Sequence, residues 1–294
     1  PNIRQQLNFA YLLAKSYEAW DSLDFVPAYE KMSQLARELK RDKMHGNFLM
    51  VDMLDDIQNQ LNILADLKEI PAMLKERQNI EVLRKIELIR SLMFTMYQNA
   101  LTREKQEKYD MATLLLYRLM EMIEQRRLAL YGLYVSSMNY SAIIYNTDYN
   151  PDFKGLDEAG RFAKLKNDVV SIKKAVFGKP GNDYLPEQVS LLEGFIILAA
   201  LHDPIVYKSD KECINLLKRI RAMVYLRNNS IFAHGLGPVE KSDYMKFRAF
   251  VEELFVQFCA AEEIPFYKTA QAMQWINPVE SENYVKTLEM KPCQ

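Results

Sequence analysis

The chain has 294 residues, of which 49% are hydrophobic and 26% charged, and its formal net charge is −1. A near-neutral chain is not a generally basic nucleic-acid binder, so any contact with RNA or DNA must come from a local group of side chains. With only 9 glycines and 11 prolines, the sequence argues against a turn-rich β fold and favours long helices.

Apolar residues recur at three- and four-residue spacing through almost the whole chain, which predicts a succession of amphipathic helices. Pro27 suits the first turn of a helix, and Pro71 should stop or kink a long one. The predicted helices cover residues 8–20, 27–40, 48–70, 80–101, 110–134, 162–177, 186–201, a segment from 211 into 227–234, and 244–262.

Polar and helix-breaking residues set the predicted boundaries. Asp110 is expected to cap the helix that follows it, and Gly132 lies near the expected end of that helix. Residues 146–160 and 178–183 are rich in Asn, Asp, Pro and Gly, which predicts loops. Pro186 is expected to open a helix that ends before the Asp203-Pro204 break.

The sequence excludes several classes of site and fold. No alternation of strands and helices appears, and there is no glycine-rich phosphate loop, so we expect an all-α fold without a Rossmann-like domain. We expect no metal site and no cofactor, because the cysteines form no paired motif and histidines are few. The cysteines are Cys213, Cys259 and Cys293, and the histidines are His45, His202 and His234.

The location of the protein is also an expectation from sequence. The most apolar run, residues 195–201, is too short to span a bilayer. The chain begins at Pro1 without a secretory pattern. We therefore expect no membrane contact and a cytoplasmic protein, and the start at Pro1 indicates a piece of a longer protein.

The segment from Arg227 to His234 carries the most specific chemistry. The two residues are seven positions apart, close to two helical turns, so on a helix both side chains would leave one face. A guanidinium can bind the non-bridging oxygens of a phosphodiester, and an imidazole can donate or accept a proton near neutral pH. This pair predicts cleavage of RNA through its 2′-hydroxyl, leaving a 2′,3′-cyclic phosphate and a 5′-hydroxyl, whereas DNA should resist.

One arginine and one histidine make a small active site. A two-fold dimer that brings the segment together twice would supply two of each, so we expect a homodimer with a composite active site. Asn228 is expected to orient the histidine or hold substrate. A local positive field for RNA binding is expected from Lys218, Arg219, Arg221 and Arg126. The competing interpretation is that His234 only interacts with a helix C-terminus and that the basic residues form a solvated face.

The pattern Arg227-Asn228 followed by His234 resembles the signature of HEPN ribonuclease domains. The wider chain is similar to one branch, the CRISPR-associated CARF–HEPN proteins of type III systems. Residues 109–112, 116–121, 125–128 and 131–133 resemble the first HEPN helix of that branch. Residues 19–21, 24–25 and 28 resemble its helical segment before the nuclease.

This resemblance implies an all-α HEPN bundle over residues 106–294, preceded by a helical spacer over residues 1–105. It also implies a homodimeric, metal-independent endoribonuclease for single-stranded RNA in antiviral defence, with Arg227 and His234 as the catalytic pair and Asn228 assisting. In that family a CARF domain binds a cyclic oligoadenylate and activates the nuclease, and no such domain is expected in this chain. Two alternatives remain: a non-catalytic helical scaffold for a partner protein, and a degenerate domain that binds RNA without cutting it.

Overall fold

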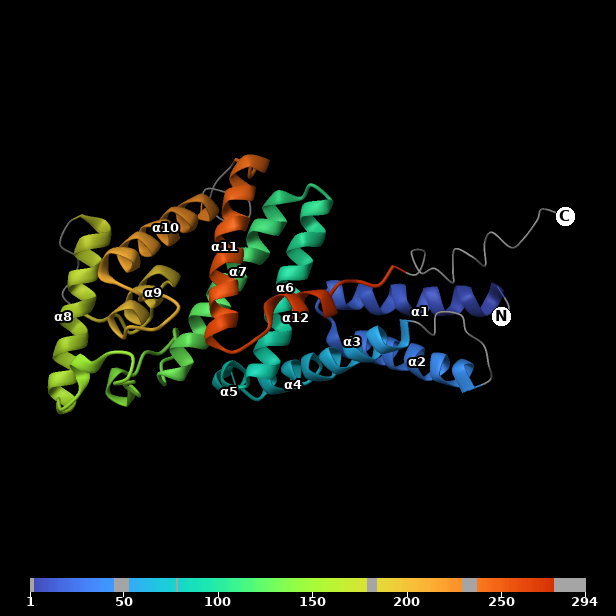
Figure 1. The fold of residues 1–294 in the computed structure, drawn as a ribbon, viewed down its shortest axis with the longest axis horizontal. Helices are drawn as coiled ribbons and strands as arrows, with labels where there is room; N and C mark the ends of the chain where they lie inside the picture. The colour runs from blue at the N-terminus through green and yellow to red at the C-terminus, as the bar shows by residue number, and fades with distance from the viewer. Residues whose placement is uncertain (1–2, 45–52, 78, 179–183, 229–236, 278–294) are drawn as a thin grey trace. The chain divides into compact units, whose positions relative to one another are not determined.

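The computed structural model describes residues 3–44, 53–77, 79–178, 184–228 and 237–277. The described residues are mostly α-helical and contain no β-strand, which confirms the all-α prediction (Figure 1). They divide into two compact units, each with its own core. Unit 1 comprises residues 1–82, 90–98 and 267–294, and unit 2 comprises residues 83–89 and 99–266.

Unit 1 is built on an antiparallel helical pair, α1 (Ile3–Asp21) and α2 (Phe25–Met44), with α3 (Leu54–Leu67) packed against α2 (Figure 1). The short α4 (Ile70–Lys75) follows, and Pro71 lies in its first turn, where a missing backbone N–H costs nothing. The chain therefore breaks between α3 and α4 at the place that Pro71 predicts. The middle of α6 (Ile86–Lys105) also belongs to this unit.

Buried hydrogen bonds join the helices of unit 1. The Trp20 indole Nε1 donates to the Thr95 hydroxyl at 3.0 Å, and the Tyr17 hydroxyl donates to Gln60 Oε1 at 2.8 Å. The Tyr17 ring also stacks on Trp275, with ring centres 5.2 Å apart. These contacts satisfy the polar ends of large side chains that would otherwise be costly to bury.

Unit 2 is a helical bundle centred on α7 (Tyr109–Leu130), which packs against α9, α10 and α11 (Figure 1). Helices α8 and α10 also pack against α9, the most apolar helix of the unit. The other members of the bundle are α8 (Glu158–Phe177), α9 (Leu191–Ala200), α10 (Asp210–Asn228) and α11 (Lys241–Ala261). Between α7 and α8 lie two short 3-10 helices, η2 (Tyr140–Ala142) and η3 (Pro151–Phe153).

The α7–α9 contact is unusually close because α9 carries glycine at position 194. A Cβ atom at Gly194 would lie 1.6 Å from Oε1 of Glu124, so the glycine makes room for this carboxyl group. The Glu124 side chain is buried, and Oε1 has no hydrogen-bond partner among the described residues. Burial, followed by the nearby Glu121, raises the pKa of Glu124 well above its ordinary value.

Several predicted boundaries need correction. Helix α9 begins at Leu191 and not at Pro186, because Ser190 and Glu193 form a capping box that sets its start. Lys108, not Asp110, is the N-cap of α7. The predicted helix over residues 80–101 is two helices, α5 (Asn79–Arg84) and α6, separated at Lys85 by extended backbone. The first residues of the predicted helix 48–70 lie outside the described part.

The sequence did not predict the last helix, α12 (Phe266–Ala272), which follows Pro265. The division into a spacer at 1–105 and a nuclease region at 106–294 stays a prediction beside the two compact units. Cys213 and Cys259 are buried free thiols, and Cys293 lies outside the described residues.

Candidate functional site

The last turn of α10 carries Arg227 and Asn228. The guanidinium carbon of Arg227 lies 4.6 Å from the centre of the Tyr117 ring on α7, and its Nη1 donates a hydrogen bond to Asn228 Oδ1 at 3.2 Å. An aromatic face and an amide oxygen therefore hold the guanidinium from two sides. A contact of this kind restricts the orientation of an arginine that would otherwise be free to rotate.

Tyr117 is buried and neutral, which decides what this contact does to the charge of Arg227. Burial and then the nearby Glu121 raise the pKa of Tyr117, against the opposing effect of Arg227. The phenol therefore stays protonated at neutral pH, and the ring orients the guanidinium without cancelling its positive charge. Arg227 therefore keeps its positive charge at the end of α10.

His234 lies in the segment 229–236, outside the described residues, so its position stays a prediction from sequence. The chain is described again from Gly237. The backbone N–H of Val239 donates to Oδ1 of Asp110 on α7 at 3.2 Å. Arg227 and Val239, which flank the predicted histidine in the sequence, thus both contact α7.

The two contacts on α7 are ordered along the helix. Asp110 and Tyr117 are seven residues apart, which corresponds to about 10 Å and nearly two turns, so they share one face. Sequence analysis missed both contacts, because it assigned Asp110 to a helix cap and treated Tyr117 only as part of a predicted amphipathic helix. The seven-residue spacing of two polar groups on α7 was the available signal.

The four predicted RNA-binding residues differ in exposure and in their ion pairs. Lys218 and Arg221 are exposed on α10. Arg219 is also exposed, but it forms an ion pair with Glu253 at 2.7 Å, which offsets its charge. Arg126 is only 6% exposed, and its guanidinium is bonded to Glu262 and to the backbone oxygens of residues 83 and 84. We therefore keep only Lys218 and Arg221 as candidate RNA contacts.

Arg126 belongs to a buried ionic cluster that holds unit 2 together. Arg127 donates to both carboxylate oxygens of Asp203 and forms a second ion pair with Glu262 at 2.7 Å. The Tyr131 hydroxyl donates to Asp203 at 2.8 Å. Burial disfavours ionisation of Glu262, but the bonds from Arg126 and Arg127 keep its pKa below the ordinary value. The cluster fixes α7 to the end of α11 and to the turn after α9.

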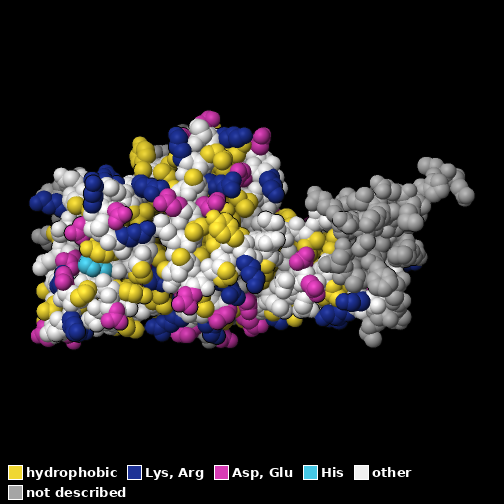
Figure 2. Space-filling view, viewed as in Figure 1, with side chains coloured by type: hydrophobic (Ala, Val, Ile, Leu, Met, Phe, Trp, Pro, Cys, Tyr) yellow, Lys and Arg dark blue, Asp and Glu magenta, His cyan; other side chains and the backbone are white. Residues whose placement is uncertain are grey.

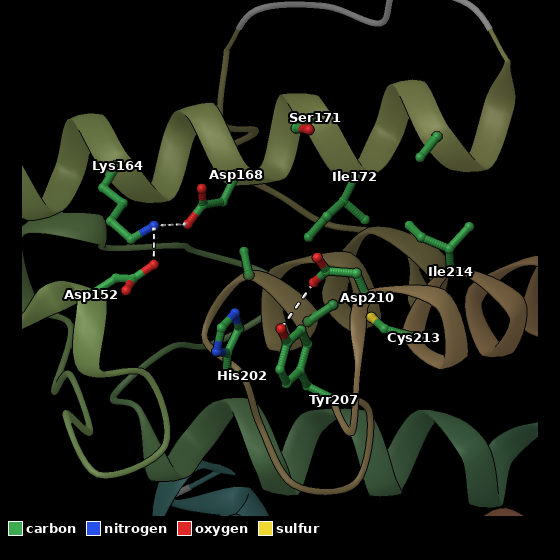
Figure 3. A pocket seen from close by; sticks show the side chains of 13 residues that line it. Asp152, Lys164, Asp168, Ser171, Ile172, His202, Tyr207, Asp210, Cys213 and Ile214 are labelled. Carbon is green, nitrogen blue, oxygen red and sulfur yellow. Dashed lines mark hydrogen bonds and ion pairs between the residues drawn. The ribbon is translucent and has the colours of Figure 1, made fainter.

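A hollow of about 410 Å³ between α8, α10 and the turn after α9 is a second place with reactive side chains (Figure 3). The rings of His202 and Tyr207 stack with their centres 3.6 Å apart. Lys164 points from α8 toward Asp152 and Asp168 and forms ion pairs with both, at 3.2 and 2.9 Å (Figure 3). Three carboxylates, the third being that of Asp210, line this hollow.

The charges of this hollow do not suit a phosphodiester. The ammonium of Lys164 is shared by two carboxylates, so an anion would meet a net negative surface. Burial lowers the pKa of His202, although Asp168 and Asp152 act in the opposite direction, and the imidazole is therefore neutral at pH 7. The end of α10, with a positively charged guanidinium, is the better candidate for an RNA site.

Basic and acidic side chains are interspersed on the face of the molecule shown in Figure 2, in keeping with the net charge of −1.

Within the described residues, no cluster of His, Cys, Asp or Glu is arranged to hold a metal ion. None of the described helices combines the length and the apolar character needed to cross a lipid bilayer.

Comparison with known proteins gives one family. The model of the family described as Csm6 HEPN domain matches residues 83–257, more than half of the chain and most of unit 2. The matched range includes Tyr117, Arg227 and the predicted His234. A search of curated proteins gave no match.

Proposed function

The chain belongs to the Csm6 HEPN domain family, a CRISPR-associated HEPN nuclease family, and on this premise we propose that it is an endoribonuclease. Its substrate is single-stranded RNA, which it cleaves without a metal to a 2′,3′-cyclic phosphate and a 5′-hydroxyl. The observation that carries this proposal is the Arg227 guanidinium held over the Tyr117 ring in the last turn of α10.

In the proposed reaction the chain supplies charge and proton transfer. The guanidinium of Arg227 binds the non-bridging oxygens and stabilises the charge that grows on phosphorus as the 2′-oxygen attacks. The imidazole of His234 exchanges a proton with the attacking or the leaving oxygen. Asn228, which accepts from Arg227 Nη1, is a positioning residue that keeps the guanidinium fork in place. Positioned proton transfer contributes roughly 10²–10⁴ in rate.

We propose that the active unit is a homodimer in which the two copies of this segment face one cleft, because a single Arg–His pair offers only one proton-transfer group. Lys218 and Arg221 are the proposed RNA contacts outside the reacting centre. The described residues include no Rossmann-like sheet domain. We therefore propose that any regulation by a cyclic oligoadenylate acts through a CARF domain outside this sequence.

The test is a digest of end-labelled single-stranded RNA by the full chain in the presence of EDTA. The products should carry 5′-hydroxyl ends that polynucleotide kinase can label directly and 2′,3′-cyclic phosphates that resist polyadenylation. An RNA with a single 2′-deoxy substitution at the mapped cleavage site is the matched control and should stay intact there. Intact RNA under all these conditions, with a partner protein bound instead, would favour the scaffold alternative.

A further inference from the structure

Three side chains of α10, Lys218, Arg221 and Tyr225, lie at spacings of three and four residues and therefore on one face of the helix. We call them the α10 stripe. All three are exposed, whereas Cys213, Leu217 and Ile220 form the buried face of the same helix. The stripe extends about 10 Å along the helix and ends two residues before Arg227.

Tyr225 is the unusual member of the stripe. Tyr225 is 72% exposed, the highest value among the described large hydrophobic residues of unit 2, at a position where helical propensity gives no reason for an aromatic residue. An exposed aromatic ring beside cationic side chains is the arrangement on which single-stranded nucleic acids stack their bases. Tyr225 precedes the proposed catalytic arginine by two residues, about 200° around the helix, so the stripe lies on another side of α10 near the same C-terminal end. The combination of an aromatic ring with cationic side chains makes RNA the ligand that this chemistry favours.

Arg221 is exposed yet held in a defined orientation. Its guanidinium carbon lies 4.8 Å from the centre of the Phe177 ring, and its Nη1 donates to the backbone oxygen of Val176 at 3.2 Å. The end of α8 thus covers one face of the guanidinium and leaves its other donors accessible. An arginine fixed in this way loses little side-chain entropy when it binds a phosphate.

The neighbouring Arg219 lies outside the α10 stripe, on another side of the same helix. It projects about 100° around the helix from Lys218, toward α11, where Glu253 pairs with it and the Phe250 ring lies 4.7 Å away. Arg219 and Arg221, two residues apart on one helix, therefore have different surroundings. One face of α10 is tied to α11, and the other presents Lys218, Arg221 and Tyr225 outward.

We propose that the α10 stripe binds the part of the RNA strand that lies on the other side of α10 from Arg227, near the end of the helix where the strand reaches the scissile bond. A base stacks on the Tyr225 ring, and Lys218 and Arg221 bind the phosphates next to it. This inference rests on the proposed function, since it identifies residues that hold the substrate of that same site. Tyr225 contributes to binding and not to the chemical step.

The test uses binding and cleavage of a fluorescent single-stranded RNA by the full chain. Binding is measured by anisotropy in a His234→Ala background, so that cleavage does not disturb it. Tyr225→Ala should weaken binding about 5- to 150-fold, whereas Tyr225→Phe and Tyr225→Trp, which keep a stacking ring, should bind nearly as well as the parent. Tyr267→Ala, which removes a 78% exposed tyrosine from unit 1, is the matched control and should bind normally.

The two cations are tested by the salt dependence of the same measurement. Lys218→Ala and Arg221→Ala should each reduce the slope of log K against log salt by about one, and Arg219→Ala should leave it unchanged. In the cleaving protein, Tyr225→Ala should raise KM and leave kcat nearly intact. Unchanged RNA affinity in Tyr225→Ala would overturn the proposal.

Two further outcomes of these experiments can be distinguished from each other. If Tyr225→Ala, but not Tyr225→Phe, changes the sedimentation coefficient from that of a dimer to that of a monomer, Tyr225 is a subunit contact and the stacking proposal is wrong. If the wild-type chain binds RNA through the stripe but never cleaves it, the endoribonuclease proposal fails and the stripe remains. Binding and cleavage measurements therefore distinguish the failure of one proposal from the failure of the other.

Discussion

The guanidinium of Arg227 rests on the face of the Tyr117 ring, with 4.6 Å between the guanidinium carbon and the ring centre. This pair connects the last turn of α10 with the middle of α7. Seven residues earlier on α7, Asp110 accepts a hydrogen bond from Val239, at the start of the chain that follows the predicted His234. Helix α7 thus serves as a scaffold that contacts the described residues on both sides of the predicted His234.

Replacing Tyr117 tests whether this scaffold matters for catalysis. We expect Tyr117→Leu to lower kcat/KM for RNA about 2- to 30-fold, because a cation–π contact contributes about 0.5–2 kcal/mol and its loss lets the guanidinium rotate. Tyr117→Phe keeps the ring and should cleave like the wild type. Equal activity of the leucine and phenylalanine variants, both folded by circular dichroism, would show that the ring has no orienting role.

The buried pair of Arg127 and Asp203 predicts a loss of stability and not of specific chemistry. Asp203→Asn should lower the free energy of unfolding by about 3–5 kcal/mol, because it leaves the Arg127 guanidinium buried without the charge of its main partner. Urea denaturation followed by circular dichroism measures this effect. Lys246→Ala, which removes an exposed ion pair with Asp243, should change stability by less than about 1 kcal/mol. Similar midpoints for both variants would contradict this account of the cluster.

The close approach of α7 and α9 predicts a coupled pair of substitutions. Gly194→Ala should be strongly destabilising, because the new Cβ atom would overlap the Glu124 carboxyl group. The same substitution in a Glu124→Ala background should cost much less, since the overlapping group is gone. A double-mutant cycle of unfolding free energies measures the coupling. Additive effects of the two substitutions would mean that the helices do not approach in this way.

The Glu124 carboxyl also predicts a dependence of stability on pH. Its pKa is raised in the folded protein, so its proton is bound more tightly there than in the unfolded chain. The contribution of Glu124 to the stability of the folded protein is therefore fully present below its ordinary pKa of 4.5. That contribution is lost as the pH rises through the raised pKa of the folded protein.

Glu124→Gln removes this titration and keeps the shape of the side chain. We expect the stability of the glutamine variant, relative to the wild type, to increase as the pH is raised from 4.5 toward neutrality. Unfolding free energies of both proteins across that range provide the measurement. A constant difference between them would show that Glu124 titrates normally.

The helical class of the fold followed from the sequence because apolar periodicity and scarce glycine are properties of each segment by itself. The break at Pro71 and the end of α7 near Gly132 were predicted for the same reason, since both depend on local backbone geometry. The start of α9 was misplaced because Pro186 is a weaker determinant than the reciprocal Ser190–Glu193 capping box.

The environment of the site was less predictable. Arg126 and Lys218 look alike in the sequence as basic residues on amphipathic helices, yet one is buried against Glu262 and the other is exposed. Tertiary packing decides between them, and the contact of Arg126 with Glu262 joins residues more than a hundred positions apart. The contact of Tyr117 with Arg227 could not be predicted either, because it also joins residues more than a hundred positions apart.

The central claim is that the guanidinium of Arg227 and the imidazole of His234 cleave RNA together. Its most direct test is the single-turnover cleavage rate of His234→Ala, with His202→Ala, in the hollow of Figure 3, as the control histidine. We predict a loss of about 10²–10⁴ for His234→Ala and a rate near that of the wild type for His202→Ala. Undiminished cleavage by His234→Ala would contradict the claim.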